Sequence, residues 1–156
     1  MTRTDQSEEA QQLAELVGRA IEHGDQAAKA LGVRLLEIRP GYARAEMKVR
    51  ANMLNSVKTC QGGVIFTLAD TVFAYACNSR NELSVAAGCS IEFLLPGEEH
   101  DVLTAEAVER TLQKRTGVYD VAVTNQEGRC IALFRGKSHR TNNQLVNQEG
   151  AKGASV

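Results

Sequence analysis

Residues 60–77, with the sequence CQGGVIFTLADTVFAYAC, decide the fold. From Val64 onward this stretch is apolar on every face, which is typical of a helix that is buried all round rather than laid on a surface. At about 1.5 Å per residue the helix is on the order of 25 Å long, too short and too interrupted to span a membrane. We therefore predict a helix at the centre of the core.

The start of this helix carries Gly62 and Gly63, which leave the first backbone amides bare. Unpaired N–H groups at a helix N-terminus, together with the positive end of the helix dipole, favour an oxygen that bears negative charge. The two glycines therefore predict an oxyanion site, with Gly62 as the donor and Gly63 as a neighbouring contact for the ligand.

The middle of the helix carries Asp70, a poor residue for a helix interior, with Phe66 and Phe73 one turn to either side. Burial among such neighbours raises the pKa of an acid, and a buried acid near a pocket is a candidate general base or nucleophile. The alternative is a structural aspartate that is hydrogen-bonded to a loop.

Outside this helix the pattern changes to strands. Ala43, Ala45, Met47 and Val49 alternate with charged residues, which predicts a half-buried strand, and Pro40-Gly41 predicts a hairpin turn before it. The expected strands are 33–39, 43–49, about 83–94, about 101–113, 117–126 and 129–139, the last four separated by Pro96-Gly97, by Gly117 and by residues 125–128. This order predicts an α+β fold in which one antiparallel sheet wraps round the central helix.

The two ends of the chain differ from this core. Residues 1–7 are expected to be loose, and a helical segment at about 8–31 is expected to form two helices separated at Gly24. Residues 141–156 are polar and rich in Asn and Gln, which predicts a disordered tail behind one domain of residues 1–140.

Composition excludes several classes of protein. A chain of 156 residues with 43% hydrophobic composition is long enough for one buried domain, and a net charge of −1 argues against nucleic-acid binding. The polar stretch from Met1 to Glu9 has no secretion signal, so we expect a cytoplasmic protein without a membrane segment. The four cysteines lack metal-ligand spacing, so neither a metal nor a disulfide is expected.

Several runs of residues together resemble one family. They are NMLN at 52–55, CQGG at 60–63, LADT at 68–71, FAYACNS at 73–79, Asp120 after TGVY, and ALFRGKSHR at 132–140. With this combination, residues 28–140 resemble the hot-dog-fold acyl-CoA thioesterases, and within them the PaaI thioesterases of bacterial phenylacetate degradation. One position departs from the family, because Gln61 stands where a histidine usually precedes the two glycines.

The resemblance implies hydrolysis of ring-hydroxylated phenylacetyl-CoA without a cofactor, since CoA is part of the substrate. In such a site the Gly62 N–H would hold the thioester oxygen, and Asp70 would either deprotonate water or attack the carbonyl carbon directly. Asn55 matches a site asparagine of the family, Thr71 matches its threonine, and Gln61 keeps a hydrogen-bonding side chain. Asn55 as a turn residue and Thr71 as a hydroxyl bonded back to its own helix are the alternatives.

The spacing of the two candidate catalytic groups indicates how many subunits form one site. Gly62 and Asp70 are eight residues apart on one helix, so about 12 Å separates them along its axis. If both act on one thioester, the amide and the carboxylate must come from two subunits with antiparallel helices. Two-fold symmetry then gives each dimer two such sites. The resemblance implies the same shared sites, and commonly a tetramer of two such dimers.

A binding site for the CoA phosphates is expected at the end of the last strand, where the candidates are Arg135, Lys137, Ser138 and Arg140. Strand alternation puts Arg135 and Lys137 on one face. Two other functions stay open: an enoyl-CoA hydratase on the same fold, and an acyl-CoA-binding module without activity.

Overall fold

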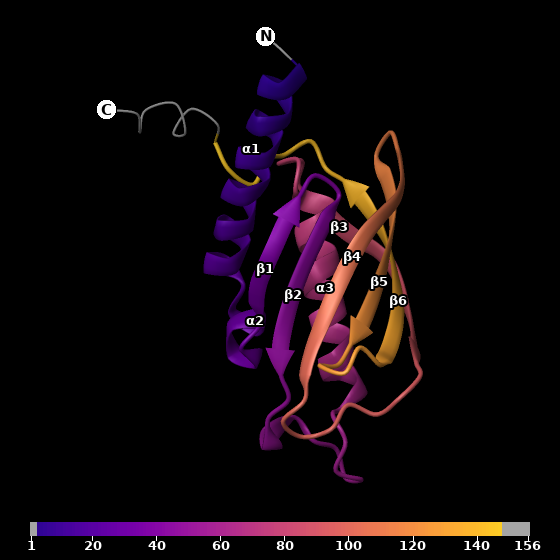
Figure 1. The fold of residues 1–156 in the computed structure, drawn as a ribbon. Coiled ribbons are helices and arrows are strands. Elements are labelled where there is room, and N and C mark those ends of the chain that lie inside the picture. The colour runs from indigo at the N-terminus through magenta and orange to yellow at the C-terminus, as the bar shows by residue number, and fades with distance from the viewer. Residues whose placement is uncertain (1–2, 148–156) are drawn as a thin grey trace, which may run out of the picture.

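The computed structural model describes residues 3–147, which form one curved sheet with three α-helices (Figure 1). The elements in chain order are α1 (Arg3–Gly24), α2 (Gln26–Leu31), β1 (Arg34–Arg39), β2 (Tyr42–Lys48), a 3-10 turn η1 (Ala51–Met53), α3 (Gly62–Asn78), β3 (Ser84–Phe93), β4 (Val102–Gln113), β5 (Thr116–Thr124) and β6 (Cys130–Arg140).

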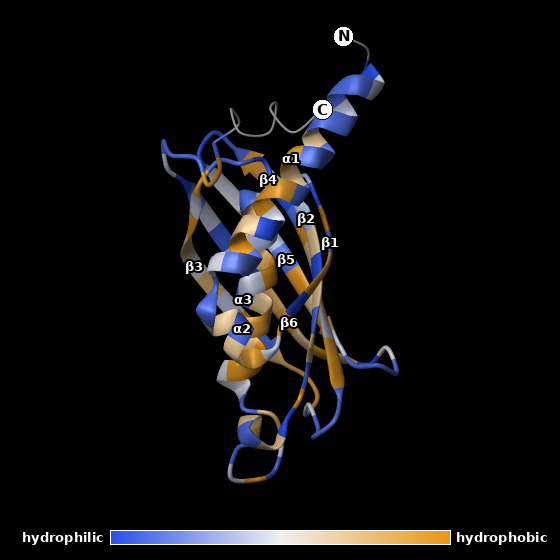
Figure 2. Cartoon of the chain, turned by 90° about the vertical axis from the view of Figure 1, so that its left-hand side faces the viewer, coloured by the Kyte–Doolittle hydropathy of each residue, from blue (hydrophilic) through white to orange (hydrophobic). Residues whose placement is uncertain are grey.

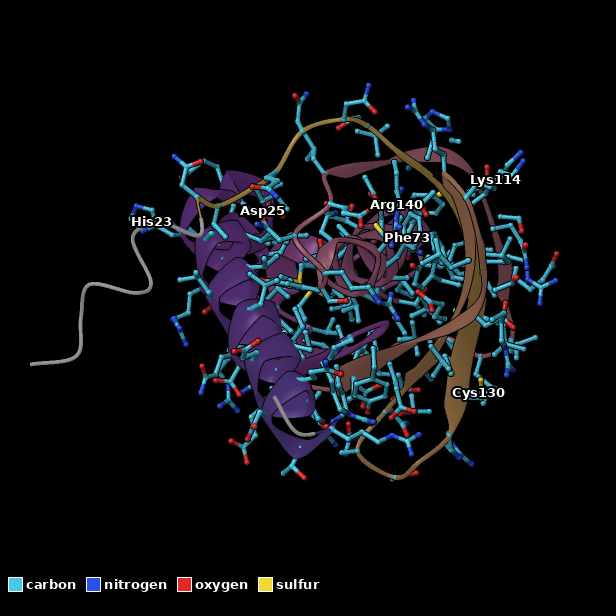
Figure 3. The ribbon with its side chains drawn as sticks, turned by 90° about the horizontal axis from the view of Figure 1, so that it is seen from above. His23, Asp25, Phe73, Lys114, Cys130 and Arg140 are labelled. Carbon is cyan, nitrogen blue, oxygen red and sulfur yellow. The ribbon has the colours of Figure 1, made fainter. Side chains whose placement is uncertain are left out.

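The six strands form a single antiparallel sheet in the order β1-β2-β4-β5-β6-β3. The sheet curves around α3, and α1 lies on the other side of that helix (Figure 3). The core is the layer between α3 and the concave face of the sheet, where Leu68, Val72 and Phe73 of α3 are buried. The predicted α+β architecture, an antiparallel sheet wrapped round a central helix, is confirmed.

The strands follow the alternation in the sequence. On β2, Ala43, Ala45 and Met47 are fully buried while the charged residues between them are more open. The hairpin at Pro40-Gly41 is confirmed as well, because Arg39 pairs with Tyr42 and Gly41 takes a positive φ of 75°.

The expected turn at Gly117 is wrong. The chain turns at Lys114-Arg115, where Lys114 adopts a φ of 54°, and β5 begins at Thr116. Gly117 lies within β5, where a Cβ would come within 2.7 Å of the Tyr119 ring and 2.8 Å of the Ser138 hydroxyl. The glycine is therefore explained by close packing rather than by a turn.

The N-terminal segment is helical earlier than expected. Residues 1–2 lie outside the described part of the chain, but α1 begins at Arg3, so residues 3–7 are not loose. These first turns extend beyond the sheet and are mostly blue, that is hydrophilic, in Figure 2. The expected short second helix is confirmed as α2, with Asp25 capping its start and Gly32 ending it in the left-handed conformation.

The two edges of the sheet differ in what lies against them. At the β1 edge, α1 lies against the strand, the Gln11 amide donates to the Ile38 carbonyl at 2.9 Å, and Glu22 accepts from the Leu35 N–H at 3.4 Å. At the other edge, β3 pairs with β6 alone among the described strands. An edge of ten residues with unpaired backbone groups is a site where another strand can add.

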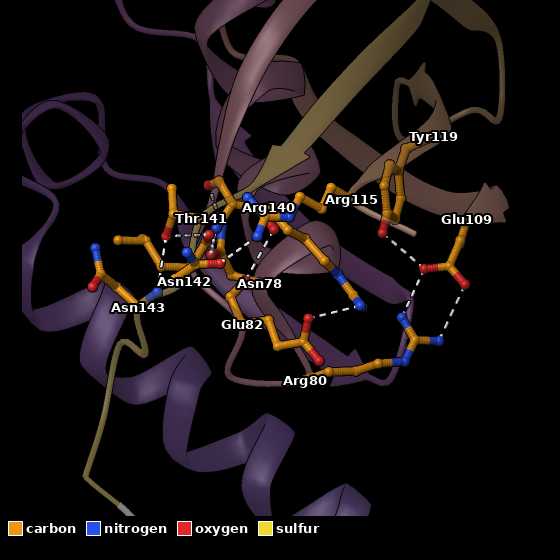
Figure 4. A network of polar contacts seen from close by, with 12 residues as sticks. Asn78, Arg80, Glu82, Glu109, Arg115, Tyr119, Arg140, Thr141, Asn142 and Asn143 are labelled. Carbon is orange, nitrogen blue, oxygen red and sulfur yellow. Dashed lines mark hydrogen bonds and ion pairs between the residues drawn. The ribbon is translucent and has the colours of Figure 1, made fainter. Parts of the chain in front are cut away.

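The C-terminal end of α3 is tied to the sheet by side chains. Asn78 accepts from the Ser84 N–H at 2.8 Å and donates to the Ser84 carbonyl at 3.2 Å, which fixes the start of β3 against the helix. Arg80 donates twice to Glu109, and Tyr119 donates to the same carboxylate at 2.7 Å (Figure 4). Burial alone would raise the pKa of Glu109, but these hydrogen bonds lower it.

The chain remains ordered beyond Arg140, contrary to the expected start of the tail. Thr141 donates to the Leu83 carbonyl, and the Asn81 side chain accepts from two backbone N–H groups of this segment and donates to the Val146 carbonyl. These bonds hold residues 141–147 against the loop after α3. Residues 148–156, where the rest of the expected tail falls, lie outside the described part of the chain.

No helix within residues 3–147 is both long enough and apolar enough to cross a membrane.

Candidate active site

The start of α3 presents bare backbone amides. Gln61 is the N-cap, its own N–H bonds to the Met53 carbonyl, and the first bonds to its carbonyl come from Val64 and Ile65. The N–H groups of Gly62 and Gly63 precede these donors, so neither has a partner within the helix. The Gln61 side chain is exposed and makes no capping bond. The helix end is therefore open to an anionic ligand.

One stripe of α3 is not buried, which corrects the expectation of a helix covered all round. Gly63, Thr67, Asp70 and Ala74 recur every three or four residues, the spacing of one helical face, and all are partly or fully exposed. The remaining faces contact the sheet and the N-terminal helices, which explains why the sequence is apolar on those faces. The open stripe runs from the bare amides past Asp70.

Asp70 is half-buried on this stripe, and among residues 3–147 no hydrogen bond or ion pair reaches its carboxylate. Burial raises its pKa first, and the negative charge of Asp25, the cap of α2, raises it further. The alternative interpretation requires a hydrogen bond between this carboxylate and a loop, and the described chain contains no such bond. It is a carboxylate that is open to solvent and more basic than usual.

The residues of β3 that point towards α3, here called its inner row, lie beside the open stripe. Ser90 and Glu92 line a depression on the convex face of the sheet, so Cys89, Ile91 and Phe93 point to the α3 side. The thiol of Cys89 lies close enough for the charge of Asp70, after burial, to raise its pKa. The sequence alone could place these three residues on one face of a strand, but not on the face beside α3.

Asn55 organises the loop before α3. Its side-chain oxygen accepts from the N–H groups of Val57 at 3.0 Å and Thr59 at 3.1 Å, and its amide donates to the Thr59 hydroxyl at 3.0 Å. This is the turn geometry that asparagine favours. One amide hydrogen is still available, because the NH₂ group has two donors.

The two threonines of α3 have different places. Thr71 follows Asp70 in the sequence but is buried, because it lies on a neighbouring face of α3 that packs against the rest of the protein. Thr67, which the sequence did not single out, lies on the stripe one turn before Asp70, and its hydroxyl donates to the Gly63 carbonyl at 2.8 Å.

The four residues at the end of β6 do not form one cluster. Arg135 and Lys137 share the exposed convex face, as predicted from alternation, whereas Ser138 is buried on the concave side. Arg135 is paired with Asp120 at 2.6 Å, and Arg140 with Glu82 at 2.7 Å. Within one chain, the sheet separates Arg135 and Lys137 from Gly62 and Asp70.

The described residues contain no group of three or more His, Cys, Asp or Glu side chains with the geometry of a metal site. All four cysteines are free thiols, of which Cys60 and Cys77 are buried.

Comparison with known proteins finds relatives in sequence and in fold. The thioesterase superfamily profile matches residues 58–132. The acyl-coenzyme A thioesterase PaaI of Escherichia coli K12 is 47% identical over 129 residues, which cover 83% of this chain and 92% of that protein.

Solved structures give the same result. The structure of the E. coli PaaI protein from the phenylacetic acid degradation operon has a TM-score of 0.85 and 46% identity, and it covers 86% of this chain and 98% of that one. A hypothetical thioesterase from Streptococcus pneumoniae TIGR4, determined with coenzyme A, has a TM-score of 0.69 and 29% identity over 72% of this chain and 90% of that one.

Proposed function

Because the chain belongs to the thioesterase superfamily, as an acyl-CoA thioesterase of the PaaI type, we propose that it hydrolyses phenylacetyl-CoA thioesters, in particular ring-hydroxylated ones, in phenylacetate catabolism. The substrate is supported by the E. coli PaaI structure, which is described as coming from the phenylacetic acid degradation operon. The observation that carries the chemistry is the unpaired, half-buried Asp70 on the same open stripe as the bare amides of α3.

In the proposed reaction, water adds to the thioester carbonyl carbon, the carbon–sulfur bond breaks, and CoA leaves as the thiol with the proton taken from water. The Gly62 N–H, with Gly63 next to it, stabilises the negative charge that forms on the carbonyl oxygen. Asp70 either takes the proton from the water or attacks the carbon itself to form an anhydride that water then opens. A carboxylate with a raised pKa is the better base for the first route.

Three further residues are proposed around this centre. Asn55 keeps one amide hydrogen for the carbonyl or the water while its other groups hold the loop. Gln61, exposed at the helix start, supplies a neutral hydrogen-bonding group near the thioester. Thr71 supports Asp70 from the buried side of the helix rather than by contact with substrate.

We propose that two subunits share each site. Gly62 and Asp70 are about 12 Å apart along one helix, too far for one thioester. The β3 edge lies beside the open stripe, has β6 as its one strand partner among residues 3–147, and can pair with the β3 of a second copy. Such a pairing about a two-fold axis brings the two stripes together in opposite directions, so Gly62 of one subunit meets the partner subunit's Asp70. Two dimers are proposed to form a tetramer.

For the CoA phosphates we propose Lys137 as the principal contact among the residues of β6. Its ammonium has no ion pair or hydrogen bond among residues 3–147, whereas Arg135 and Arg140 are held by acidic partners and Ser138 is buried. Its place on the convex face means that the bound CoA belongs to a site of another subunit in the assembly.

The test is a panel of aryl and alkyl acyl-CoA esters, followed by the loss of thioester absorbance and by released thiol, with an enzyme blank because Cys89 is exposed. Phenylacetyl-CoA and its hydroxylated forms are expected to be hydrolysed fastest, and Asp70→Asn is expected to lower kcat at least about a hundredfold with unchanged circular dichroism. With an enoyl-CoA added to the panel, loss of its enoyl absorbance without thiol release would indicate a hydratase, and binding without turnover would indicate a binding module. Either result contradicts the proposal.

A further inference from the structure

The ring of Phe93 lies directly against the first residue of α3. A Cβ placed on Gly62 would come within 3.0 Å of Phe93 Cζ and within 3.4 and 3.5 Å of its two Cε atoms. The outer end of the ring therefore lies against the residue whose N–H is the proposed oxyanion donor. A side chain at position 62 would require the end of the ring to move by a few tenths of an ångström.

Phe93 is not a core residue in spite of this contact. Its side chain is 52% exposed, and none of the aromatic ring pairs among the described residues includes it. A phenyl ring normally loses much of its area on folding, so the exposed part is apolar surface left open to a further contact. Leu94, the next residue, is also half exposed.

The strand brings Phe93 to one end of the site. The four steps along the strand from Cys89 to Phe93 span about 13 Å, which matches the distance of about 12 Å between Gly62 and Asp70 on α3. The inner row of β3 therefore runs beside the open stripe from the carboxylate to the bare amide. Phe93 stands at the amide end, where the thioester carbonyl is expected.

We propose that Phe93 determines acyl-group specificity: its exposed ring forms the apolar wall beside the Gly62 N–H, against which the apolar part of the acyl group lies. The inference rests on the proposed function, because it takes the Gly62 N–H as the group that holds the carbonyl oxygen. A carbonyl bound there has its acyl carbon within reach of the ring, since the ring touches the same residue. An aryl or alkyl group on that carbon covers the exposed face.

The experiment compares Phe93→Ala and the more conservative Phe93→Leu with Leu133→Ala. Leu133 is a matched control because it is 49% exposed but lies on the convex face of the sheet. The measured quantity is kcat/KM for phenylacetyl-CoA divided by kcat/KM for the shortest straight-chain ester that the wild type hydrolyses. We expect this ratio to change about tenfold or more in Phe93→Ala, less in Phe93→Leu, and not in Leu133→Ala.

Gly62→Ala provides an independent test of the same contact. The alanine keeps the N–H, but its Cβ requires the tip of the Phe93 ring to move. We expect it to change the ratio in the same direction as Phe93→Ala. In the double variant the two changes should not add, because the ring that the Cβ displaces has been removed.

Three results would overturn the inference. An unchanged ratio would mean that the ring does not contact the acyl group. An equal loss for every ester would mean that Phe93 only positions the helix start. A lower oligomer mass in Phe93→Ala, measured by light scattering, would mean that a second subunit covers the ring. In all three cases the wild type still hydrolyses acyl-CoA and Asp70→Asn does not, whereas failure of the proposed function leaves the wild type itself inactive.

Discussion

Gly136 of β6 is a point of close approach between the sheet and Phe73 of α3, and Gly136→Ala measures how tightly the helix is held. A Cβ at this position would lie 2.8 Å from Phe73 Cδ2 and Cε2 and 2.9 Å from Cγ, whereas ordinary contact begins at 3.4 Å. The ring must therefore move by 0.6 Å, the difference between 3.4 and 2.8 Å. It is 1% exposed and lies between Tyr119 and Phe134, with ring centroids 5.5 and 5.8 Å away.

Since the ring is buried and lies against two other rings, we expect an overpacking cost of about 2 kcal/mol. For a chain of this length, that lowers Tm by roughly 4–8 °C. Urea unfolding followed by circular dichroism gives the free energy directly. Gly24→Ala is the control, because nothing lies within 4 Å of its Cβ. Phe73→Leu should reduce the cost of Gly136→Ala in the double variant. A change within about 0.5 kcal/mol for Gly136→Ala alone would refute the close approach.

Three further predictions concern charges and the helix start. Asp25→Asn keeps a cap for α2 but removes a charge that raises the pKa of Asp70, so the acid limb of the pH profile of kcat/KM should move to lower pH; a limb that stays in place contradicts this. Glu109→Gln leaves Arg80 without an anionic partner and should cost about 2 kcal/mol at neutral pH. Because the pKa of Glu109 is lowered in the folded state, its contribution is present above the ordinary value of 4.5 and lost as pH falls below it, so the deficit measured by urea unfolding should shrink in acid. Gln61→His should change kcat by less than about threefold near neutral pH, since the exposed side chain makes no capping bond, and a large gain would show that Gln61 impairs the site.

The fold was predictable where the sequence has a strong period. The alternation from Ala43 to Val49 predicted the correct strand and the correct buried face, and the break at Gly24 correctly separated α1 from α2. The turn before β5 was misplaced because Gly117, which suggests a turn, is required instead by the side chains of Tyr119 and Ser138. Tyr119 lies on the same strand as Gly117, but Ser138 lies opposite on β6, and the pairing of these two strands has no local signal.

The site was predictable only in part for the same reason. Asp70 and Gly62 stand out within one helix, by residue type and spacing. The contacts of Phe93 with Gly62, and the closeness of Asp25 and Cys89 to Asp70, join segments that are far apart in the sequence. Alternation placed Arg135 and Lys137 on one face of β6, but which face points to α3 depends on how the sheet curves.

The central claim is that Gly62 of one subunit and Asp70 of its partner act on the same thioester. Asp70→Asn and Gly62→Pro remove one group each, and the proline suits its position because Gln61 has the extended conformation, φ −57° and ψ 130°, that precedes proline. Gly62→Ala controls for the added carbon, since it keeps the N–H. Each of the two variants should fold by circular dichroism and be inactive alone.

The decisive measurement is the activity of the two inactive variants after they are unfolded and refolded together. A mixed dimer combines both defects in one site but joins an intact Gly62 to an intact Asp70 in the other. With random pairing, half of the dimers are mixed and each has one intact site, so about a quarter of the wild-type activity should return. If mass spectrometry demonstrates mixed dimers and activity stays absent, the two residues do not meet across an interface and the account is wrong.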